Sequence, residues 1–297
     1  MKNYLKTILC MAVCSLLCVS CASKRQRLVY SYNVNNQRPV FWVEYQPYPE
    51  FPNTTDFVRP VPMYHGWTDE RMERDLRRMQ FAGITGILIT IRPQDIAQQH
   101  ARERCKHFYE LVQKKYPSIK LALYFTAGDG HELSMPLQNV MNFFQYQGFG
   151  EYSNSIQING KTVLFLDKSM ILTGGYIGRY SYIRFGKEWP DKTIWAGNAE
   201  ITNPQKFAWA IAANNGGIHF SMPGILNKWP ISRDNGKSLF AAVQNAVQKD
   251  AKIICISSWN NYKTGSYIEE NTYDHAAMLW TLKYIQEDLD SPQPNKE

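Results

Sequence analysis

Short apolar runs alternate with longer stretches of helical spacing along most of the chain. From residue 38 onward the apolar runs have the length and the β-branched content of buried strands, and several are followed by an amphipathic segment. The pattern predicts seven strands, at residues 40–45, 84–91, 119–126, 162–167, 193–198, 217–222 and 252–258. Strands that alternate with helices in this way are typical of a parallel sheet wrapped by helices.

Helical spacing and end signals predict helices between and after these strands. Thr68 is a capping residue for one helix, because its hydroxyl can accept a hydrogen bond from the first turn, and Met72, Leu76 and Met79 then share one face. A second helix spans residues 95–116 and a last one spans residues 273–289. The last helix directs an apolar set toward the core, made up of Ala277, Leu279, Leu282 and Ile285.

No repeat or linker divides the body of the chain, residues 38–290. The fold class predicted is α/β, a single (β/α)8 TIM barrel, because a body of this length matches the barrel's typical size of about 250 residues. The eighth strand is not visible in the pattern, and residues 170–190 and 224–237 are the stretches that could contain it. Residues 291–297 form a polar tail.

The first 20 residues have the pattern of an export signal, in which Lys2 and Lys6 precede an apolar stretch at residues 8–19. We therefore interpret residues 1–20 as a cleaved signal peptide. A globular core has no use for such a segment, and the small and polar residues after it do not continue the apolar run.

The end of this segment, Ser20-Cys21, resembles the lipobox of bacterial lipoproteins, although Cys18 replaces the leucine usually found three residues before the cleavage site. The resemblance implies cleavage before Cys21 and acylation of its thiol, with residues 21–37 as the lipidated cysteine and a tether. An ordinary secretory signal is the alternative. A lipidated cysteine predicts an exported lipoprotein anchored to a membrane, in the periplasm or on the cell surface.

The composition of the chain excludes two classes of protein, nucleic-acid-binding proteins and disulfide scaffolds. The chain carries 33 basic and 26 acidic residues, but five of the basic ones lie within the first 27 residues and leave a nearly neutral body. The body has no basic stretch, so we expect no nucleic-acid partner. Four of the six cysteines precede residue 22, which excludes a disulfide scaffold.

The common cofactor and nucleophile motifs are also missing from the sequence. The six histidines show no metal-ligand spacing, no glycine-rich phosphate loop follows the first strand, and no Gly-x-Ser-x-Gly elbow occurs. Cys255 lies inside an apolar strand, where a small buried residue is the simpler interpretation. We predict no metal and no cofactor.

In a barrel of this kind the chemistry lies in the loops that follow the carboxyl ends of the strands. Carboxylates occur there at several positions, namely Glu44, Asp129, Asp167, Glu200 and Glu269. Asp129 and Asp167 are the preferred catalytic candidates because they follow neighbouring predicted strands, and Glu44 is the third. His131 is a candidate for substrate binding beside Asp129.

The segment from Ile253 to Glu269 brings a buried strand into a cluster of aromatic and polar residues, Ser-Trp-Asn-Asn-Tyr-Lys-Thr-Gly-Ser-Tyr-Ile-Glu. It resembles the final-strand motif of glycoside hydrolase families 71 and 99 and their bacterial relatives, Ser-aromatic-Asn-Glu-aromatic-x-Glu-Gly-Thr/Ser-x-Ile-Glu. Residues 82–86, 156–166 and 223–236 resemble other segments of these families. The resemblance implies a barrel that takes a polysaccharide or oligosaccharide.

The family's two catalytic glutamates in this motif correspond to Asn261 and Thr264 in this sequence. An amide and a hydroxyl can hydrogen-bond a sugar but cannot serve as general acid or base. What remains is a scaffold with a sugar-facing wall, whose predicted glycan-binding residues are Trp259, Asn260, Asn261, Tyr262, Thr264, Tyr267, Glu269 and His131.

Three hypotheses therefore stay open. The protein is a glycosidase whose carboxylates have moved to other rim positions, a non-catalytic glycan-binding lipoprotein, or a structural lipoprotein that keeps only the fold. Resemblance of fold does not decide among them.

Overall fold

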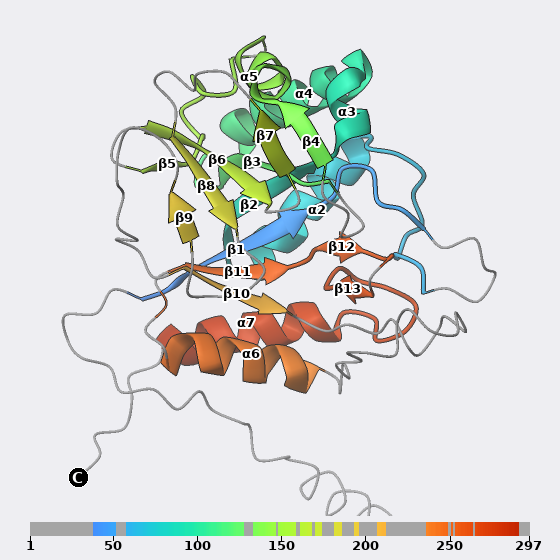
Figure 1. Ribbon diagram of the computed structural model, residues 1–297. Helices are drawn as coiled ribbons and strands as arrows, with labels where there is room; N and C mark the ends of the chain where they lie inside the picture. The colour runs from blue at the N-terminus through green and yellow to red at the C-terminus, as the bar shows by residue number, and fades with distance from the viewer. Residues whose placement is uncertain are drawn as a thin grey trace, which may run out of the picture.

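A computed structural model gives the fold of the chain (Figure 1). It describes residues 38–51, 58–127, 133–146, 148–158, 161–167, 170–173, 181–185, 193–195, 207–211, 236–248, 251, 253–263 and 265–290. The predicted signal peptide, Cys21, the tether and the polar tail lie outside these residues, as does the predicted strand at 217–222. No helix in the described part is long and apolar enough to cross a membrane.

The main sheet is a curled, mostly parallel sheet that forms half of a barrel. Its strand order is β10-β11-β1-β2-β3-β6-β8-β9. The bounds are β1 Val40–Tyr45, β2 Ile84–Ile91, β3 Lys120–Phe125, β6 Lys161–Asp167, β8 Ser181–Phe185, β9 Thr193–Trp195, β10 Phe207–Ile211 and β11 Ile253–Ser257. Neighbours pair in parallel except β8 with β9, and a short β5 (Gln157–Ile158) pairs antiparallel with β6.

Two small sheets accompany the main one. The strands β4 (Leu133–Pro136) and β7 (Met170–Thr173) pair in parallel. A hairpin of β12 (Asn260–Asn261) and β13 (Ser266–Tyr267) follows β11. The hairpin therefore lies beyond the carboxyl end of the strand that carries the predicted final-strand motif.

Helices cover the outer face of the curled sheet, as in a barrel, where the helices form the outer ring. They are α2 Asp69–Phe81, α3 Pro93–Ala97, α4 Gln99–Lys115, α5 Leu137–Tyr146, α6 Lys237–Gln248 and α7 Ala277–Asp290. In Figure 1 α6 and α7 lie side by side at the opposite side of the molecule from α5. The Thr68 hydroxyl accepts a hydrogen bond from the Arg71 amide and caps α2, as predicted.

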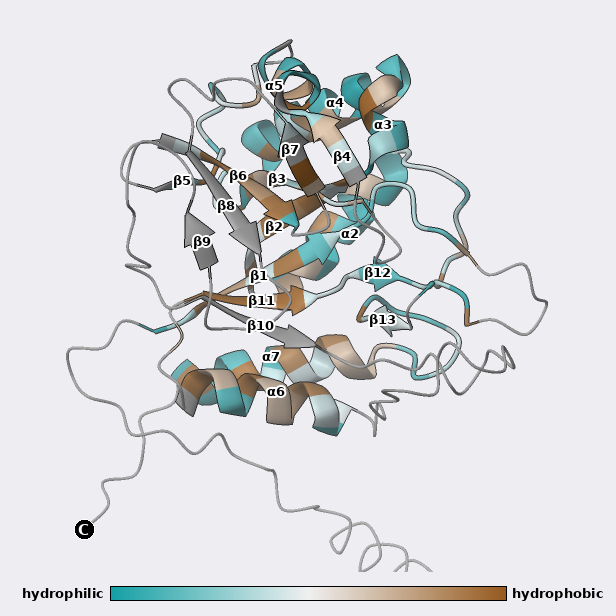
Figure 2. Ribbon diagram, in the orientation of Figure 1, coloured by the Kyte–Doolittle hydropathy of each residue, from teal (hydrophilic) through white to brown (hydrophobic). Residues whose placement is uncertain are grey.

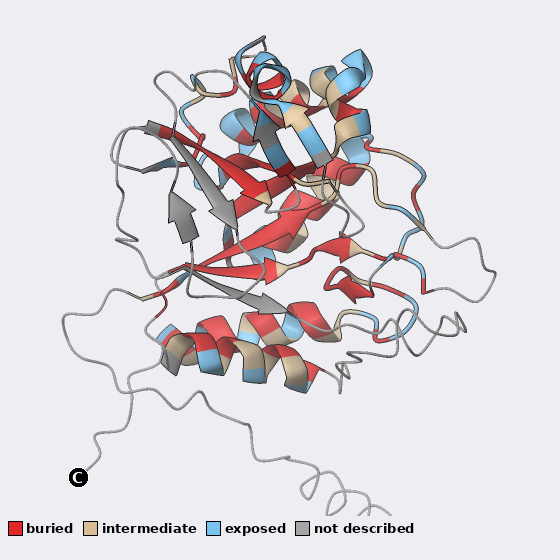
Figure 3. Cartoon of the chain, in the orientation of Figure 1, coloured by how far each residue is buried: buried red, intermediate tan, exposed pale blue. Residues whose placement is uncertain are grey.

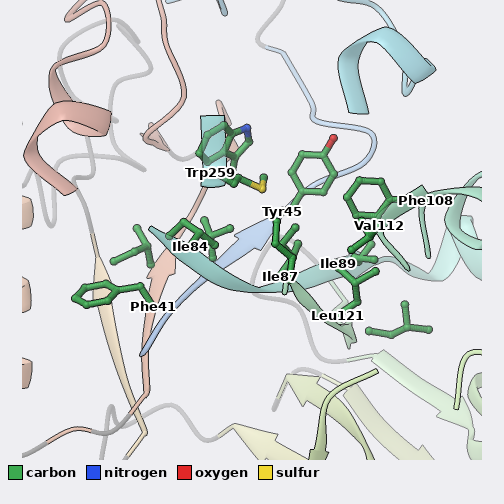
Figure 4. Close-up of a cluster of buried hydrophobic side chains, with 14 of the residues drawn as sticks. Phe41, Tyr45, Ile84, Ile87, Ile89, Phe108, Val112, Leu121 and Trp259 are labelled. Atoms are coloured by element: carbon green, nitrogen blue, oxygen red, sulfur yellow. The ribbon is translucent and has the colours of Figure 1, made fainter. Parts of the chain in front are cut away.

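The two faces of the strands have different partners. On the helix-covered face, strand side chains and helix side chains form one large core, part of which Figure 4 shows around Phe41, Tyr45 and Trp259. On the other, concave face a smaller apolar cluster contains Trp42, Leu88, Ala122, Tyr124, Ile156, Val163, Phe165, Ile253 and Cys255. Figures 2 and 3 show the central strands as apolar and buried.

The structure departs from the sequence predictions in specific places. Among the described strands, no pairing joins β10 to β9, so the described part is an open half-barrel rather than the predicted closed (β/α)8 barrel. The predicted strand at 193–198 is present as β9 but runs antiparallel to β8. The predicted helix at 95–116 is two helices, because Gln98 adopts an extended conformation between α3 and α4.

Strands that the pattern did not mark also occur. β8 lies within residues 170–190, one of the two stretches proposed for the eighth strand, and β10 was not predicted at all. In α7 the core position assigned to Ala277 is only partly buried, and Met278 is fully buried instead.

Candidate functional site

Glu44 projects from the concave face of β1 near the carboxyl end of the strand. The Ser257 hydroxyl on β11 donates a 2.9 Å hydrogen bond to its Oε2, and the Thr90 hydroxyl on β2 donates a 3.3 Å bond to its Oε1. The three residues lie on three adjacent strands of the sheet. The carboxyl group is thus held in one orientation by both neighbouring strands.

Burial raises the pKa of Glu44 to about 7. The two hydroxyl donors act in the opposite direction, and the negative charge of Asp167 raises the pKa further. A carboxyl with this pKa is protonated in about half of the molecules at neutral pH. It can therefore donate a proton under conditions in which an ordinary glutamate is ionised.

Asp167 is the last residue of β6 and is partly exposed. Its Oδ2 accepts a 2.8 Å hydrogen bond from the hydroxyl of Tyr124, which lies on the neighbouring strand β3. Burial and the charges of Asp167 and Glu44 keep the pKa of Tyr124 well above its usual value, so the phenol remains a donor. Glu44 and Asp167 thus face the same concave surface from β1 and β6.

The polar groups of this surface lie above an apolar floor. Trp42 precedes Glu44 by two residues and packs edge-on against Phe165, with ring centroids 6.0 Å apart. Cys255 precedes Ser257 by two residues in the same way and is buried in the same cluster. The alternation of β-strands places these pairs on one face, with the apolar member farther from the carboxyl end.

The structure brings together two of the three predicted catalytic residues, Glu44 and Asp167. Asp129 and His131 lie outside the described residues, as does Glu200. Sequence reasoning missed the supporting residues Thr90, Tyr124 and Ser257. Their positions at the ends of predicted strands, with the period-2 alternation of the concave face, are the signal that could have identified them.

The aromatic residues of the final-strand motif are buried. Trp259 has no exposed surface and belongs to the same core as Tyr45, and both rings are labelled in Figure 4. Tyr262 and Tyr267 stack on each other with centroids 4.6 Å apart and pack against Val58. These rings, predicted to contact sugar, have packing roles in the described structure, and their role in binding stays a prediction.

Asn260 connects the hairpin to the loop that follows β1. Its Oδ1 accepts a 2.8 Å hydrogen bond from the Gln46 amide, and its Nδ2 donates a 2.8 Å bond to the Gln46 carbonyl oxygen. The side chain is fully buried. The amide therefore pairs with a backbone as a strand would, and both of its polar atoms are used within the protein.

The two positions that correspond to the family's glutamates differ in what the structure describes. Asn261 is partly buried in β12, and its backbone amide donates a 2.9 Å hydrogen bond to the Ser258 hydroxyl. Thr264 lies outside the described residues. At the hairpin, Lys263 pairs with Glu50 of the β1–α2 loop at 2.7 Å.

A buried ionic cluster lies between α2, the β1–α2 loop and the hairpin. Arg71 is its centre: the guanidinium donates to the carbonyl oxygens of Gln46, Pro47 and Gly66 and to Oδ2 of Asp75. It also lies 3.8 Å from the centroid of the Tyr64 ring. The sequence pattern does not mark this cluster, because an arginine on a predicted amphipathic helix is ordinarily exposed.

Glu269 joins the same cluster from the other side. Its Oε1 accepts a 2.6 Å hydrogen bond from the Tyr64 hydroxyl, and the side chain is fully buried. Burial raises the pKa of Glu269 to about 8, with a further contribution from Asp75 and an opposing one from Arg71. Glu269 is thus enclosed beneath the hairpin, whereas the pair of Glu44 and Asp167 lies at the concave face.

Within the described residues no group of three or more histidine, cysteine or acidic side chains could hold a metal ion. Cys105 and Cys255 are buried free thiols. Burial raises the pKa of both well above the usual value, so neither is an activated nucleophile.

No protein-family model matches the chain, and no curated protein matches it. Solved structures do. A GH99 endo-α-mannosidase from Bacteroides thetaiotaomicron aligns with a TM-score of 0.56 and 14% identity, over 84% of this chain and 97% of that one. A second structure of a GH99 endo-α-mannosidase from this organism has a TM-score of 0.55 and 12% identity, over 84% and 98%.

A third solved structure, described as a glycoside hydrolase-like protein, aligns with a TM-score of 0.54 and 13% identity. The alignment covers 88% of this chain and 96% of that one. At such identities the likeness concerns the fold. The chain therefore has a glycoside hydrolase-like α/β fold related to that of the GH99 enzymes.

Proposed function

We propose that the protein is a glycoside hydrolase that cleaves an oligosaccharide or polysaccharide at the concave face of its half-barrel. The observation that carries the proposal is the arrangement of Glu44, a buried carboxyl with a pKa of about 7, on the same face as the carboxylate of Asp167. Glycoside hydrolysis ordinarily requires one carboxyl that donates a proton and a second that acts on the other side of the bond.

In this proposal Glu44 is the general acid. Its proton passes to the glycosidic oxygen as the bond from that oxygen to the anomeric carbon breaks. A water oxygen then forms the new bond to the anomeric carbon, and the proton of that water passes to Asp167. The Ser257 and Thr90 hydroxyls orient Glu44, and Tyr124 orients Asp167.

These positions differ from those that the resemblance to families 71 and 99 implies. Asn261 and Thr264 stand where the family motif has its glutamates. The proposal therefore places the acid and base on strands β1 and β6 rather than on the hairpin. Asp129, which lies outside the described residues, is an alternative base because it follows β3, the neighbour of β6.

The experiment is a hydrolysis assay of the purified protein against a panel of glycans that includes α-linked mannosides and glucans. Glu44→Gln and Asp167→Asn should each abolish hydrolysis while leaving glycan binding measurable. Glu50→Gln is the matched control, because Glu50 lies on the loop after β1 but is exposed and pairs with Arg92 and Lys263. Hydrolysis that survives both site substitutions would refute this assignment.

A non-catalytic glycan-binding protein is the second candidate. Asn261 favours it, because an amide at the family's catalytic position can bind sugar without cleaving it. The same panel separates the two functions. Binding of several glycans with cleavage of none supports the binder.

We also propose that the protein is an exported lipoprotein, anchored to a membrane through an acylated Cys21. The support is the order of features in the first 21 residues: two lysines, an apolar run and a small residue directly before Cys21. Such an anchor needs no spanning helix. In a bacterium it would place the half-barrel in the periplasm or on the cell surface, where glycans are accessible.

A further inference from the structure

Three large aromatic side chains are exposed side by side on the outer surface of α2 and α7. Phe81, Trp280 and Tyr284 expose between 41% and 49% of their surface. The rings of Phe81 and Trp280 pack edge to face with centroids 5.0 Å apart, and Trp280 and Tyr284 lie 6.1 Å apart. We call these three residues the aromatic patch. Single exposed apolar residues are ordinary, but a contiguous group marks an interaction site.

The patch lies close to the point where the described chain begins. Arg38 pairs with Asp290 and donates to Gln286, both in the last turns of α7. Tyr284 and Asp290 are six residues apart on this helix, which corresponds to about 9 Å along its axis. Cys21 precedes Arg38 by 17 residues, a length that spans at most about 60 Å. An acyl group on Cys21 would therefore hold Arg38, and the flank beside it, within about 60 Å of the membrane, which lets the patch reach the lipid surface.

The chemistry of the patch fits the boundary between lipid headgroups and acyl chains. Tryptophan and tyrosine rings are amphipathic and concentrate at this depth. Lys283, whose ammonium lies 5.8 Å from the centroid of the Phe81 ring, can bury its stem and extend its charge to the headgroups. From these observations we propose that the aromatic patch docks the flank of α2 and α7 on the phospholipid bilayer in which Cys21 is anchored. This inference rests on the proposed anchor.

The charges around the patch are mixed. Lys283 and Arg77 are accompanied by Glu73, Glu287 and Asp288 on the same two helices. Apolar and aromatic contact, rather than attraction to anionic lipid, would therefore supply the docking energy. Docking should accordingly be insensitive to salt and should occur on phosphatidylcholine vesicles with or without phosphatidylglycerol.

The test uses the full acylated protein, reconstituted in such vesicles, with one fluorescent label. Tyr284→Cys places the label in the patch. Gln145→Cys places it at an exposed position of α5, and α5 lies at the opposite side of the molecule from α7 in Figure 1. The described cysteines Cys105 and Cys255 are buried and should not react. Brominated lipids should quench the label at position 284 and spare the one at position 145. Adding Trp280→Ser to the Tyr284→Cys variant should reduce the quenching.

Equal quenching at both positions, with Cys21 acylated by mass spectrometry, would overturn the docking and leave the anchor intact. Absence of acylation would overturn both. Two results in detergent would show that the patch has another role, and either would also overturn the proposal. The first is a dimer that Trp280→Ser dissociates, and the second is glycan binding that Trp280→Ser weakens. The rate of hydrolysis of soluble glycans should be the same in wild type and Trp280→Ser. The hydrolysis assay therefore tests the proposed enzymatic function independently of membrane docking.

Discussion

The hydroxyl of Ser257 donates a 2.9 Å hydrogen bond to the carboxyl of Glu44, 213 positions earlier in the chain. The bond joins the carboxyl ends of β11 and β1, which pair in parallel. It fixes the orientation of the proposed acid without fully offsetting the cost of burying its charge, since the pKa is still raised to about 7. The position and the proton affinity of Glu44 thus both follow from the pairing of β1 with β11, the first and last strands of this sheet in sequence order.

The rate of hydrolysis should fall as pH rises through about 7. The reason is that the general acid must be protonated, and Glu44 loses its proton near this pH. The pH profile of kcat/KM measures it. In the Ser257→Ala variant, which removes a donor to the carboxylate, the descending limb should move to higher pH, because that donor lowers the pKa. If the descending limb of the pH profile does not move in Ser257→Ala, Glu44 is not the group whose ionisation causes it.

The free energy of unfolding should decrease as pH rises above about 4.5. In the unfolded chain both Glu44 and Glu269 have the usual pKa of about 4.5, whereas in the folded protein the values are about 7 and about 8. The folded state therefore holds these protons more tightly, so its stabilisation is complete below pH 4.5 and is lost through pH 7 and pH 8. Each unit of pKa difference corresponds to about 1.4 kcal/mol.

Urea denaturation at a series of pH values measures this dependence. Glu44→Gln and Glu269→Gln should each flatten it over the corresponding range, because the amide does not titrate. An unfolding free energy that rises between pH 5 and pH 8 in wild type, and is unchanged in slope in both variants, would contradict the assignment.

Arg71→Ala should lower the free energy of unfolding by about 3–5 kcal/mol, because the buried Asp75 and Glu269 would lose the buried guanidinium between them and keep only Arg74 as a cation. Three backbone carbonyl oxygens would also lose their donor. Arg77→Ala is the control on the same helix. Arg77 is exposed and makes a 3.6 Å ion pair with Glu73, so its loss should cost less than about 1 kcal/mol. Thermal or chemical denaturation compares the two, and similar losses would exclude the network as the cause.

Trp259→Ala should lower the free energy of unfolding. The ring is fully buried in the core, so its removal should cost about 3–5 kcal/mol. Trp280→Ala should cost less than about 1 kcal/mol because half of that ring is already exposed. If the folded fraction of Trp259→Ala binds glycan with unchanged affinity, the predicted sugar contact at Trp259 is wrong.

Cys21→Ser should release the protein from membranes, since the thiol is the predicted acylation site. Cell fractionation and metabolic labelling with a palmitate analogue give the result. Cys10→Ser is a suitable control because Cys10 lies outside the lipobox and the predicted cleavage removes it. Label that persists in Cys21→Ser would disprove the lipoprotein assignment.

The sequence pattern identified the strands that are buried on both faces. β1 and β2 have the predicted bounds, because both are rich in buried β-branched, aromatic and other apolar residues, although Glu44 interrupts the run in β1 and Thr85, Gly86 and Thr90 interrupt the run in β2. β10 was missed because the run from Phe207 to Ile211 contains two alanines and continues into Ala212 and Ala213, so it lacks the β-branched content that marks the other strands. The break at Gln98 was missed for another reason. It depends on Pro93 starting a short helix and on a hydrogen bond from the Arg92 amide to Asp95, which no periodicity reports.

The candidate site was predictable in part. Glu44 and Asp167 follow from their positions at strand ends. Their partners, and the raised pKa of Glu44, depend on which strands become neighbours, and the pairing of β1 with β11 is invisible to local pattern. The same limit applies to Trp259, since an aromatic residue just beyond a strand can turn toward the rim or toward the core.

The pairing of β1 with β11 also bears on synthesis of the protein. The backbone groups on one side of Val40–Val43 remain without their strand partner until Ile253–Ile256 have been made. The loop after β1 waits likewise for Asn260. More than 200 residues are thus translated while an apolar strand edge is open, and such edges are sites of aggregation. Contacts of this sequence separation also slow folding. The nascent chain should therefore depend on chaperones that bind exposed apolar strands until residues 253–256 emerge.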